Sequence, residues 1–352
     1  MNTNERKTDV LDTFGLTHEQ TRIMFSIQRL MVMQDIEKTT NSEKRKLKRE
    51  WLIGWERNIK NFLMGIDSNK AETKLYELSE LRTAAINEIH KDIHNKTWYY
   101  IVLLEATLFV AYTPLGESAD EKFKGLKYSK QTEYLKTIVK SHCVVNEVWI
   151  DRFEKTYKKT MSKIKGTNWK IAIWLAITAT ATAIAAIYAG PIAVAIFGKG
   201  FTLSGAALTS ACLAAAGGGA IAAGGAGMAG GVLVIAGGGA LLGAAGGGVV
   251  TGVMTLAVKS SVYVLSQAAK LEVVLKEIVL NAQQDIKCAQ DILKNYKNQI
   301  NELKKELEIL KRDDKKNKEA IKEMKKSIEY MEKSFKNSQV FTSCFEIGMN
   351  NK

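Results

Sequence analysis

A long uncharged run in the second half of the chain restricts the possible folds more than any other feature. Between Lys170 and Lys259 lie 88 residues, and Lys199 is the only charged residue among them. The run also holds 20 of the 27 glycines. The other 264 residues carry 86 of the 87 Lys, Arg, Asp and Glu side chains. This segregation excludes a single globular enzyme as the default, and the hydrophobicity of the run excludes simple disorder.

Proline usage favours an all-α fold. The chain of 352 residues has two prolines, Pro114 and Pro191, and proline is the residue that interrupts helices most strongly. We expect a helical bundle, then Gly/Ala-rich membrane-type helical hairpins, then a long C-terminal coiled-coil helix or helical hairpin. The expected regions are 1–165 for an N-terminal helical domain, 166–258 for a glycine-zipper transmembrane or membrane-inserting region, 259–340 for the coiled coil and 341–352 for a tail.

Several helices are predicted in the first 165 residues. Thr17-His-Glu-Gln20 is a capping box that opens the first helix, and Asn41 or Ser42 can cap the second. Residues 98–112 are apolar nearly all round but fewer than the roughly 20 that a membrane crossing needs. We therefore expect them to form the central buried helix of a bundle. The other helices are expected over about 70–93, 127–142 and 145–161.

A resemblance to a known family accompanies this central segment. Residues 103–112 read Leu-Leu-Glu-Ala-Thr-Leu-Phe-Val-Ala-Tyr, and residues 116–123 read Gly-Glu-Ser-Ala-Asp-Glu-Lys-Phe. Together they resemble the TerB-like, tellurite-resistance-type helical domains, in which a small apolar helix precedes an Ala-Asp-Gly-Glu-type turn and an acidic helix start. The resemblance covers about 98–159 and implies a TerB-like helical domain. It departs at 113–115, where Thr-Pro-Leu stands in place of the Asp that the family usually has.

The uncharged run is long enough to cross a membrane. Residues 171–197 alone would form a helix of about 40 Å, against roughly 30 Å for the hydrocarbon core of a bilayer. Aromatic rings near the ends of this helix are typical of membrane interfaces. A Gly-Pro step can bend it, and a lysine is expected at a turn because burying it in lipid is costly. These interface or turn residues are Trp169, Trp174, Tyr188, Pro191 and Lys199.

Glycines spaced four residues apart indicate how membrane helices could pack. Small residues at this spacing let two helix backbones approach closely in a bilayer. The expected packing residues are Gly227, Gly231, Gly239, Gly243, Gly247, Gly248 and Gly252. Lysine-rich flanks on both sides of the run place both flanks in the cytoplasm, which requires an even number of crossings, two or four. Permanent insertion and conditional exposure of a buried hairpin both stay open.

A heptad pattern follows the uncharged run. Apolar residues recur in steps of three and four from residue 275 to residue 310 and again from 321 to 335, as in a coiled coil. The seam residues that we single out are Ile300, Leu303, Leu307, Leu310, Ile321, Met324, Ile328 and Met331. Polar residues between them allow either one long helix or an antiparallel hairpin. Such a seam serves oligomerisation or packs back onto the N-terminal helices.

The sequence contains no pattern typical of an enzyme or a metal site. The four cysteines are far apart, which fits neither a disulfide framework nor a zinc site. His90 and His94 share a helical spacing but lack the HExxH pattern. We therefore expect no catalytic residue, no cofactor and no metal.

The net charge of +13 favours a membrane surface as the partner. It is not concentrated in a basic block of the kind that binds nucleic acid. Lysines border the uncharged run instead, where they would meet anionic lipid. They are Lys155, Lys158, Lys159, Lys163, Lys165 and Lys170 before the run, and Lys259 and Lys270 after it. The first ten residues lack an apolar signal core, so we expect no secretion.

The order of the regions resembles that of a known group of toxins. In α-helical pore-forming toxins of the cytolysin A and haemolysin BL type, a hydrophobic tongue lies between long helices. We hypothesise a membrane-inserting, oligomeric protein that forms a pore or disrupts the membrane, as a bacterial stress or defence effector with a regulatory soluble domain. The alternative is a membrane-anchored scaffold without a pore, whose coiled coil recruits a protein partner.

Both hypotheses imply a lipid partner and the same location. The partners are the lipid bilayer, further copies of the chain and, for the scaffold, a protein that binds the coiled coil. Nucleic acid is not expected. The protein would reside at the cell membrane with its flanks facing the cytoplasm, or in the cytoplasm until conditional insertion.

Overall fold

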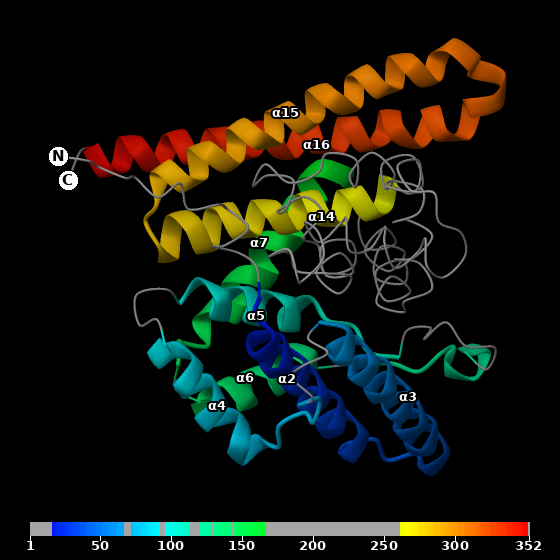
Figure 1. Cartoon of the computed structure of the whole chain (residues 1–352), viewed down its shortest axis with the longest axis vertical. Coiled ribbons are helices and arrows are strands. Elements are labelled where there is room, and N and C mark those ends of the chain that lie inside the picture. The colour runs from blue at the N-terminus through cyan, green and yellow to red at the C-terminus, as the bar shows by residue number, and fades with distance from the viewer. Residues whose placement is uncertain are drawn as a thin grey trace. The chain divides into compact units, whose positions relative to one another are not determined.

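The computed structural model describes residues 16–66, 72–91, 96–112, 120–128, 130–142, 144–166 and 261–350. All regular elements in these ranges are helices and none is a strand, which confirms the predicted all-α class for the described residues. The chain divides into two compact units (Figure 1). The described residues between 16 and 166 belong to the N-terminal unit, and residues 261–350 belong to the C-terminal unit. The expected membrane-type hairpins lie outside the described residues.

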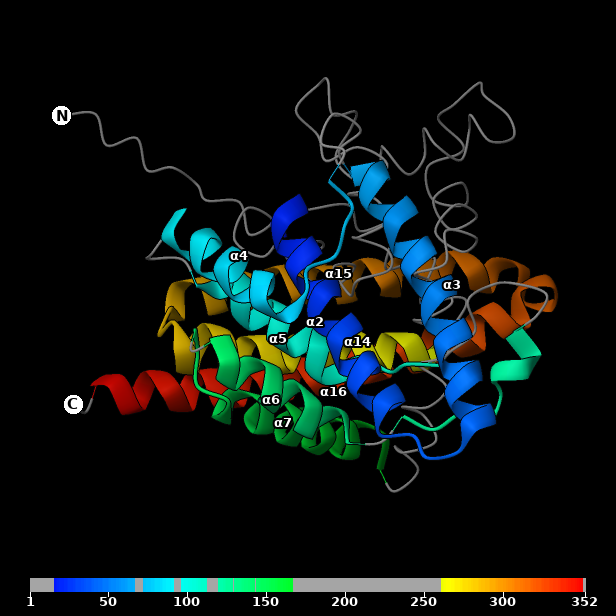
Figure 2. The same ribbon diagram turned by 90° about the horizontal axis from the view of Figure 1, so that it is seen from below.

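The N-terminal unit is a bundle of helices arranged around α2. Its elements are α2 (His18–Glu37), α3 (Ser42–Ile66), α4 (Leu78–Lys91), α5 (Thr97–Leu108), the 3₁₀ turn η1 (Asp120–Phe123), α6 (Gln131–His142) and α7 (Val148–Lys165). α2 packs against α3, α4, α5 and α6, and Figure 2 shows it between α3 and α4. Every residue of α2 from Thr21 to Gln28 is buried. α5 is buried over most of its surface, as predicted, so α2 and α5 together form the centre of this bundle.

Short-range signals place the first two helix starts. Thr17 and Gln20 form the predicted capping box. The N–H of Gln20 donates to Oγ1 of Thr17 at 3.2 Å, and the N–H of Thr17 donates to Oε1 of Gln20 at 3.1 Å. At the second helix, Oδ1 of Asn41 accepts a hydrogen bond from the N–H of Lys44 at 2.8 Å. Of the two candidate caps, Asn41 therefore makes the capping hydrogen bond.

α4 begins at Leu78, and the earlier start predicted for this helix is wrong. The backbone N–H of Tyr76 donates to Oγ of Ser26 in α2 at 2.9 Å, so it is engaged outside any helix. The N–H of Glu77 donates to the carboxylate of Glu80 at 3.1 Å, which caps the helix at its observed start. This backbone hydrogen bond lowers the pKa of Glu80, although slight desolvation acts in the opposite direction.

Two other helices are shorter than predicted. α5 ends at Leu108 rather than at residue 112, and α6 begins at Gln131 rather than near residue 127. Tyr112 has a φ of 65°, a left-handed conformation that a right-handed helix cannot contain. The chain therefore leaves the helical conformation before Tyr112.

The C-terminal unit is built around its longest helix, α16. Its elements are α14 (Ser261–Val273), the π-helix η5 (Val274–Ala282), α15 (Ile286–Leu310), the 3₁₀ turn η6 (Lys311–Asp313) and α16 (Asp314–Asn350). α16 packs against both α14 and α15. It remains helical through Asn350, beyond residue 340 where the tail was expected to begin. Two polar residues of this last part pack against the rest of the unit. The side chain of Thr342 is buried, and the carboxylate of Glu346 accepts a hydrogen bond from Gln290 of α15.

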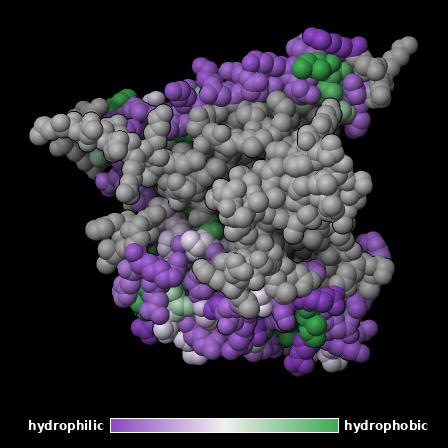
Figure 3. Space-filling model, in the orientation of Figure 1, coloured by the Kyte–Doolittle hydropathy of each residue, from purple (hydrophilic) through white to green (hydrophobic). Residues whose placement is uncertain are grey.

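The described surface is mostly hydrophilic over both units on the face drawn in Figure 3. Some large apolar side chains of the described residues are nevertheless exposed. They are Ile53, Leu78, Val148, Ile309, Val340, Ile347 and Met349. Single exposed apolar side chains are normal on the surfaces of folded proteins, so most of them need no functional explanation.

Candidate functional site

The residues expected in or beside a membrane lie outside the described residues. The glycine packing set is Gly227, Gly231, Gly239, Gly243, Gly247, Gly248 and Gly252, and the interface or turn set is Trp169, Trp174, Tyr188, Pro191 and Lys199. Their roles stay predictions. Among the helices that the structure describes, none combines the length and the apolar character that a bilayer crossing requires.

The predicted seam residues are described, and they lie on two helices that pack against each other. The buried ones are Ile300, Leu303 and Leu307 of α15, and Ile321, Met324, Ile328 and Met331 of α16. Leu310, at the end of α15, is half-buried. The structure therefore brings the two halves of the heptad pattern together within one chain.

α15 and α16 form an antiparallel hairpin, one of the two arrangements that the sequence left open. The rings of Tyr296 and Phe335 lie 6.0 Å apart between their centroids. Farther along α15 and nearer the start of α16, Lys304 and Glu332 form an ion pair at 2.7 Å. At the joint, Nδ2 of Asn317 donates to the backbone carbonyl of Leu310 at 3.2 Å. This bond satisfies one of the carbonyl groups that a helix leaves unpaired at its end.

A buried polar cluster in the N-terminal unit was not predicted from the sequence. Nζ of Lys48 in α3 donates to Oδ2 of Asp35 in α2 at 2.5 Å, and the hydroxyl of Tyr112 donates to the same oxygen at 2.6 Å. Asp35 is 3% exposed, and Lys48 and Tyr112 are each 6% exposed. Lys48 also donates to Oγ1 of Thr39 at 3.0 Å. The cluster thus joins α2, α3 and the segment after α5 through one desolvated carboxylate.

Aromatic rings pack against Tyr112, which donates to this carboxylate. The ring of Trp51 contacts the ring of Tyr112 edge to face, with 5.3 Å between their centroids. The ring of Tyr128 also contacts Tyr112 edge to face, with 6.0 Å between their centroids. Among the described residues, the buried hydroxyl of Tyr128 has no hydrogen-bond partner. Burial, with a further contribution from the charge of Asp35, raises the pKa of Tyr128 well above its usual value. The ring thus stays neutral beside the ion pair.

One sequence signal could have found this cluster. Asp35 follows Ile23, Ile27 and Met31 at successive steps of four, so it occupies a core position of its helix. A charged residue at a core position is rare unless it is paired. The signal indicates a buried partner but does not identify that partner, because the choice depends on tertiary structure.

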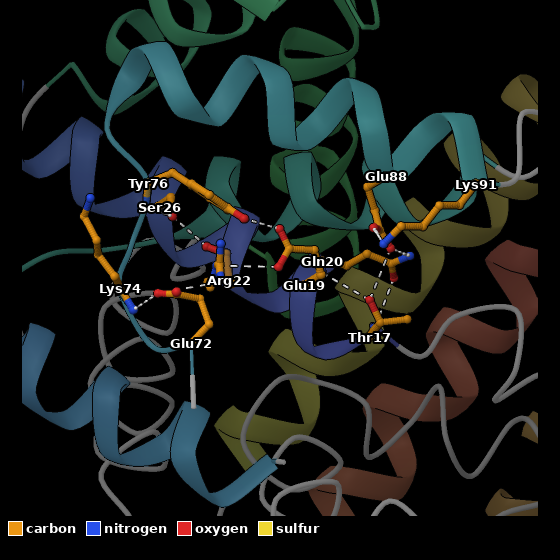
Figure 4. Close-up of polar contacts among 10 residues, drawn as sticks. All are labelled: Thr17, Glu19, Gln20, Arg22, Ser26, Glu72, Lys74, Tyr76, Glu88 and Lys91. Carbon is orange, nitrogen blue, oxygen red and sulfur yellow. Dashed lines mark hydrogen bonds and ion pairs between the residues drawn. The ribbon is translucent and has the colours of Figure 1, made fainter. Parts of the chain in front are cut away.

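A second polar network fastens the start of α2 to α4 (Figure 4). The carboxylate of Glu88 is buried and accepts a hydrogen bond from Nε2 of Gln20 at 3.3 Å. It also pairs with Nζ of Lys91 at 2.5 Å. The same carboxylate lies 3.5 Å from Oγ1 of Thr17, the capping residue of α2. One carboxylate thus links the capping box to α4.

The same close-up shows how the segment before α4 is held against α2. The guanidinium of Arg22 lies 4.1 Å from the centroid of the Tyr76 ring, within the range of a cation–π contact. Glu19 accepts a hydrogen bond from the hydroxyl of Tyr76 and forms an ion pair with Arg22 at 3.5 Å. These contacts occur within one unit and explain its packing. They do not indicate catalysis.

Neither network resembles a metal or nucleophile site. Within the described ranges, no group of three or more His, Cys, Asp or Glu residues is arranged to hold a metal ion. His94 of the predicted histidine pair lies outside those ranges. Burial raises the pKa of Cys288 to about 12, with smaller contributions from Asp285 and Asp291. This thiol is therefore not activated as a nucleophile.

Four of the lysines that precede the uncharged run lie along one side of α7, whereas Lys170 and Lys259 lie outside the described residues. Ile150, Phe153 and Met161 are buried on the other side of that helix, whereas Lys155, Lys159 and Lys163 are exposed, as is Lys158. After the run the pattern differs, because Lys270 is buried within α14. The exposed charge beside the run is therefore carried by α7 among the described residues.

Comparisons of the chain with models of protein families, with curated proteins and with solved structures find no match. In the segment that resembles TerB-like domains, α5 supplies the apolar helix. Among the acidic residues that follow, Asp120 and Glu121 are described, and they lie in the 3₁₀ turn η1 rather than at the start of an α-helix. The TerB-like and pore-forming-toxin resemblances stay predictions.

Proposed function

We propose that this chain is a membrane-inserting helical protein that oligomerises and forms a pore or disrupts the bilayer. The observation that carries the proposal is the run of 88 residues in which Lys199 is the only charge. In lipid every backbone polar group needs an internal partner, so such a run inserts as helices. Its length suits two long crossings or four shorter ones.

The charged units on either side support a regulated effector. Both contain amphipathic helices with charged outer surfaces, and the lysines beside the run favour the cytoplasmic side of a membrane for both units. A TerB-like N-terminal unit would sense or regulate, as in a bacterial stress or defence effector. The proposal involves no catalysis, and it includes a chain that stays in the cytoplasm until it inserts.

The hairpin of α15 and α16 has a more limited role in self-association in this proposal than the heptad pattern alone suggested. We interpret α15 and α16 as an antiparallel coiled coil within one chain. All of the singled-out seam side chains except the half-buried Leu310 are already buried, so in this conformation the seam offers little apolar surface to a second copy. We therefore assign self-association to the glycine-spaced surface of the uncharged run, where close helix contacts are favoured in lipid.

Dye release from liposomes tests the proposal. Purified full-length protein should release an encapsulated dye, and replacing Gly239, Gly243 and Gly247 by Ile should reduce release because the larger side chains keep helices apart. A matched control replaces three alanines of the same run by Ile, namely Ala172, Ala176 and Ala183. Absence of release under every oligomerising condition would exclude the pore, and equal loss in both variants would exclude the glycine surface.

A membrane-anchored scaffold is the second candidate. It is favoured by Val340 and Ile347 near the end of α16, which are 60% and 61% exposed and offer a partner protein an apolar contact. Replacing residues 171–258 with an unrelated membrane hairpin distinguishes the two functions. A scaffold would keep its activity, whereas a pore-forming chain would lose it. Carbonate extraction of membranes shows first whether the chain is inserted at all.

A further inference from the structure

The solvent-facing side of α7 carries a stripe of three lysines. Lys155, Lys159 and Lys163 follow one another at a spacing of four residues, which places them on one side of the helix. All three are exposed. We propose that this lysine stripe binds the anionic headgroups of a lipid bilayer and selects the membrane that the uncharged run enters. The selection of a membrane for insertion rests on the proposed function, but headgroup binding does not.

The bundle holds the stripe in a fixed orientation. Phe153, Tyr157 and Met161 are buried on the opposite side of α7, and α7 packs against α5 and α6. The helix therefore cannot rotate its lysines inward without exposing this apolar side. A rigid row of positive charges suits an extended anionic surface better than a single small ligand.

The stripe lysines differ from neighbouring lysines in their ion-pair partners among the described residues. Nearby lysines have acidic partners: Lys158 pairs with Glu154 at 2.5 Å, and Lys136 of α6 pairs with Asp151 at 2.7 Å. Within the part of the chain that the structure describes, the three stripe lysines form no ion pair with a carboxylate. Like charges four residues apart repel each other along a helix, so an anionic partner relieves an unfavourable arrangement.

The position of the stripe in the chain connects it to the membrane. Lys163 precedes the first residue of the uncharged run, Ile171, by eight residues. Even a fully extended chain of that length spans only about 28 Å, which is comparable with the thickness of a hydrocarbon core. Insertion of the run therefore keeps the stripe close to the membrane surface.

α3 carries another exposed basic surface of the same unit and provides the control. Lys46, Arg49 and Lys60 lie on one side of α3 and are exposed, around the exposed side chain of Ile53. They carry the same three charges as the stripe. Lys60 precedes the uncharged run by more than a hundred residues, so no short covalent link ties this surface to the point of insertion as it does for the stripe.

Vesicle flotation of the full-length protein tests the proposal. Vesicles of phosphatidylcholine alone are compared with vesicles in which phosphatidylglycerol replaces part of it. Since the uncharged run inserts into both kinds, the readout is the ratio of binding to the anionic and the neutral vesicles. We expect K155Q/K159Q/K163Q to lower this ratio on the order of a hundredfold, from roughly fivefold per lysine. K46Q/R49Q/K60Q should leave it nearly unchanged, and the Lys→Arg triple variant of the stripe should retain it.

Several results would overturn the proposal. They are an unchanged ratio in the stripe variant with native circular dichroism, an equal loss in the α3 variant, or no wild-type preference for anionic vesicles. Tighter binding of a nucleic acid duplex than of anionic vesicles, lost in the stripe variant, would assign the stripe to nucleic acid instead. Dye release is scored separately, so binding without release would contradict the pore and leave the stripe supported.

Discussion

The carboxylate of Glu323 in α16 accepts a hydrogen bond, 2.9 Å long, from the backbone N–H of Ser261, the first residue of α14. The N–H groups at the start of a helix have no partner within the helix and carry a partial positive charge. Ser261 also follows the uncharged run by only a few residues. A side chain of α16 therefore caps the helix into which the run leads.

Removing this remote cap should loosen the start of α14. Glu323→Ala should cost about 1 kcal/mol of stability, as for other helix caps, and Glu323→Gln should cost less because its amide oxygen still accepts a hydrogen bond. Hydrogen exchange at the first turn of α14 measures the effect. Glu329→Gln is the control, since Glu329 pairs with Lys333 on the surface, where such pairs contribute little. An equal effect in the control would contradict the cap.

The same contact should make α14 sensitive to acid. Burial alone would raise the pKa of Glu323, but hydrogen bonds from Ser261 and the charge of Lys326 lower it on balance. A carboxyl group with a lowered pKa in the folded state stabilises that state above its unfolded pKa of about 4.3, and this contribution is lost as the pH falls through the folded value. The stability difference between wild type and Glu323→Gln should therefore shrink between neutral and strongly acidic pH. A difference that does not change with pH would contradict this.

The buried pair of Lys48 and Asp35 should be costly to break on one side only. Lys48→Met leaves the carboxylate of Asp35 buried without its counter-charge, and such changes cost about 3–5 kcal/mol. Asp35→Asn combined with Lys48→Met should recover most of that loss, because no charge then stays buried. Urea denaturation of the single variant, the double variant and the control variant Lys122→Met gives their free energies of unfolding. Lys122→Met, which breaks the exposed pair with Glu50, should cost under about 1 kcal/mol.

The sequence predicted those features that depend on neighbouring residues. The capping box of Thr17 and Gln20 requires only four consecutive residues, and the structure confirms it. The periodicity of three and four predicted a seam, and residues such as Leu303 and Met324 are buried. Both features arise from local geometry, namely the orphan N–H groups of a helix start and the repeat of one helix face.

Features that depend on distant residues were missed. Leu75 continues the apolar spacing of α4, but Tyr76 donates its N–H to Ser26, which lies 50 residues earlier in the chain. Tyr112 reaches Asp35 across 77 residues. The spacing of apolar residues does not encode these pairings, because they depend on which helices the fold brings together. For the same reason the polar joint between α15 and α16 was compatible with either a straight helix or a hairpin.

Because the seam lies within one chain, its stability should not depend on protein concentration. Leu303→Ala removes a fully buried side chain and should cost about 2–5 kcal/mol. Its effect on the thermal midpoint of the full-length protein should be the same at low and high concentration. Ile309→Ala in the same helix is the control, since Ile309 is 51% exposed and its truncation should cost under about 0.5 kcal/mol. A midpoint that rises with concentration in the wild type but not in Leu303→Ala would place the seam between copies instead.

The contact between α14 and α16 depends on small side chains. Oγ of Ser334 donates to the backbone carbonyl of Ala268 at 3.0 Å, and both residues are fully buried. A side chain as short as serine reaches a backbone carbonyl of another helix only where the two helices approach closely. Ser327 and Ser338 are also buried on α16. Ser334→Ala should cost about 1 kcal/mol through the lost hydrogen bond.

Ser334→Leu should cost more than Ser334→Ala, because the added carbons must enter a packed interface, for which about 1–3 kcal/mol is typical. Ser343→Leu, the same substitution at an exposed position of α16, is the control and should change stability by under about 0.5 kcal/mol. Thermal unfolding of the full-length variants gives the order of their stabilities. Since Ser334 contacts Ala268 of α14, Ser334→Leu should also increase hydrogen exchange along α14 more than along α15. Equal exchange in both helices would mean that the substitution destabilises the whole unit rather than the α14–α16 contact.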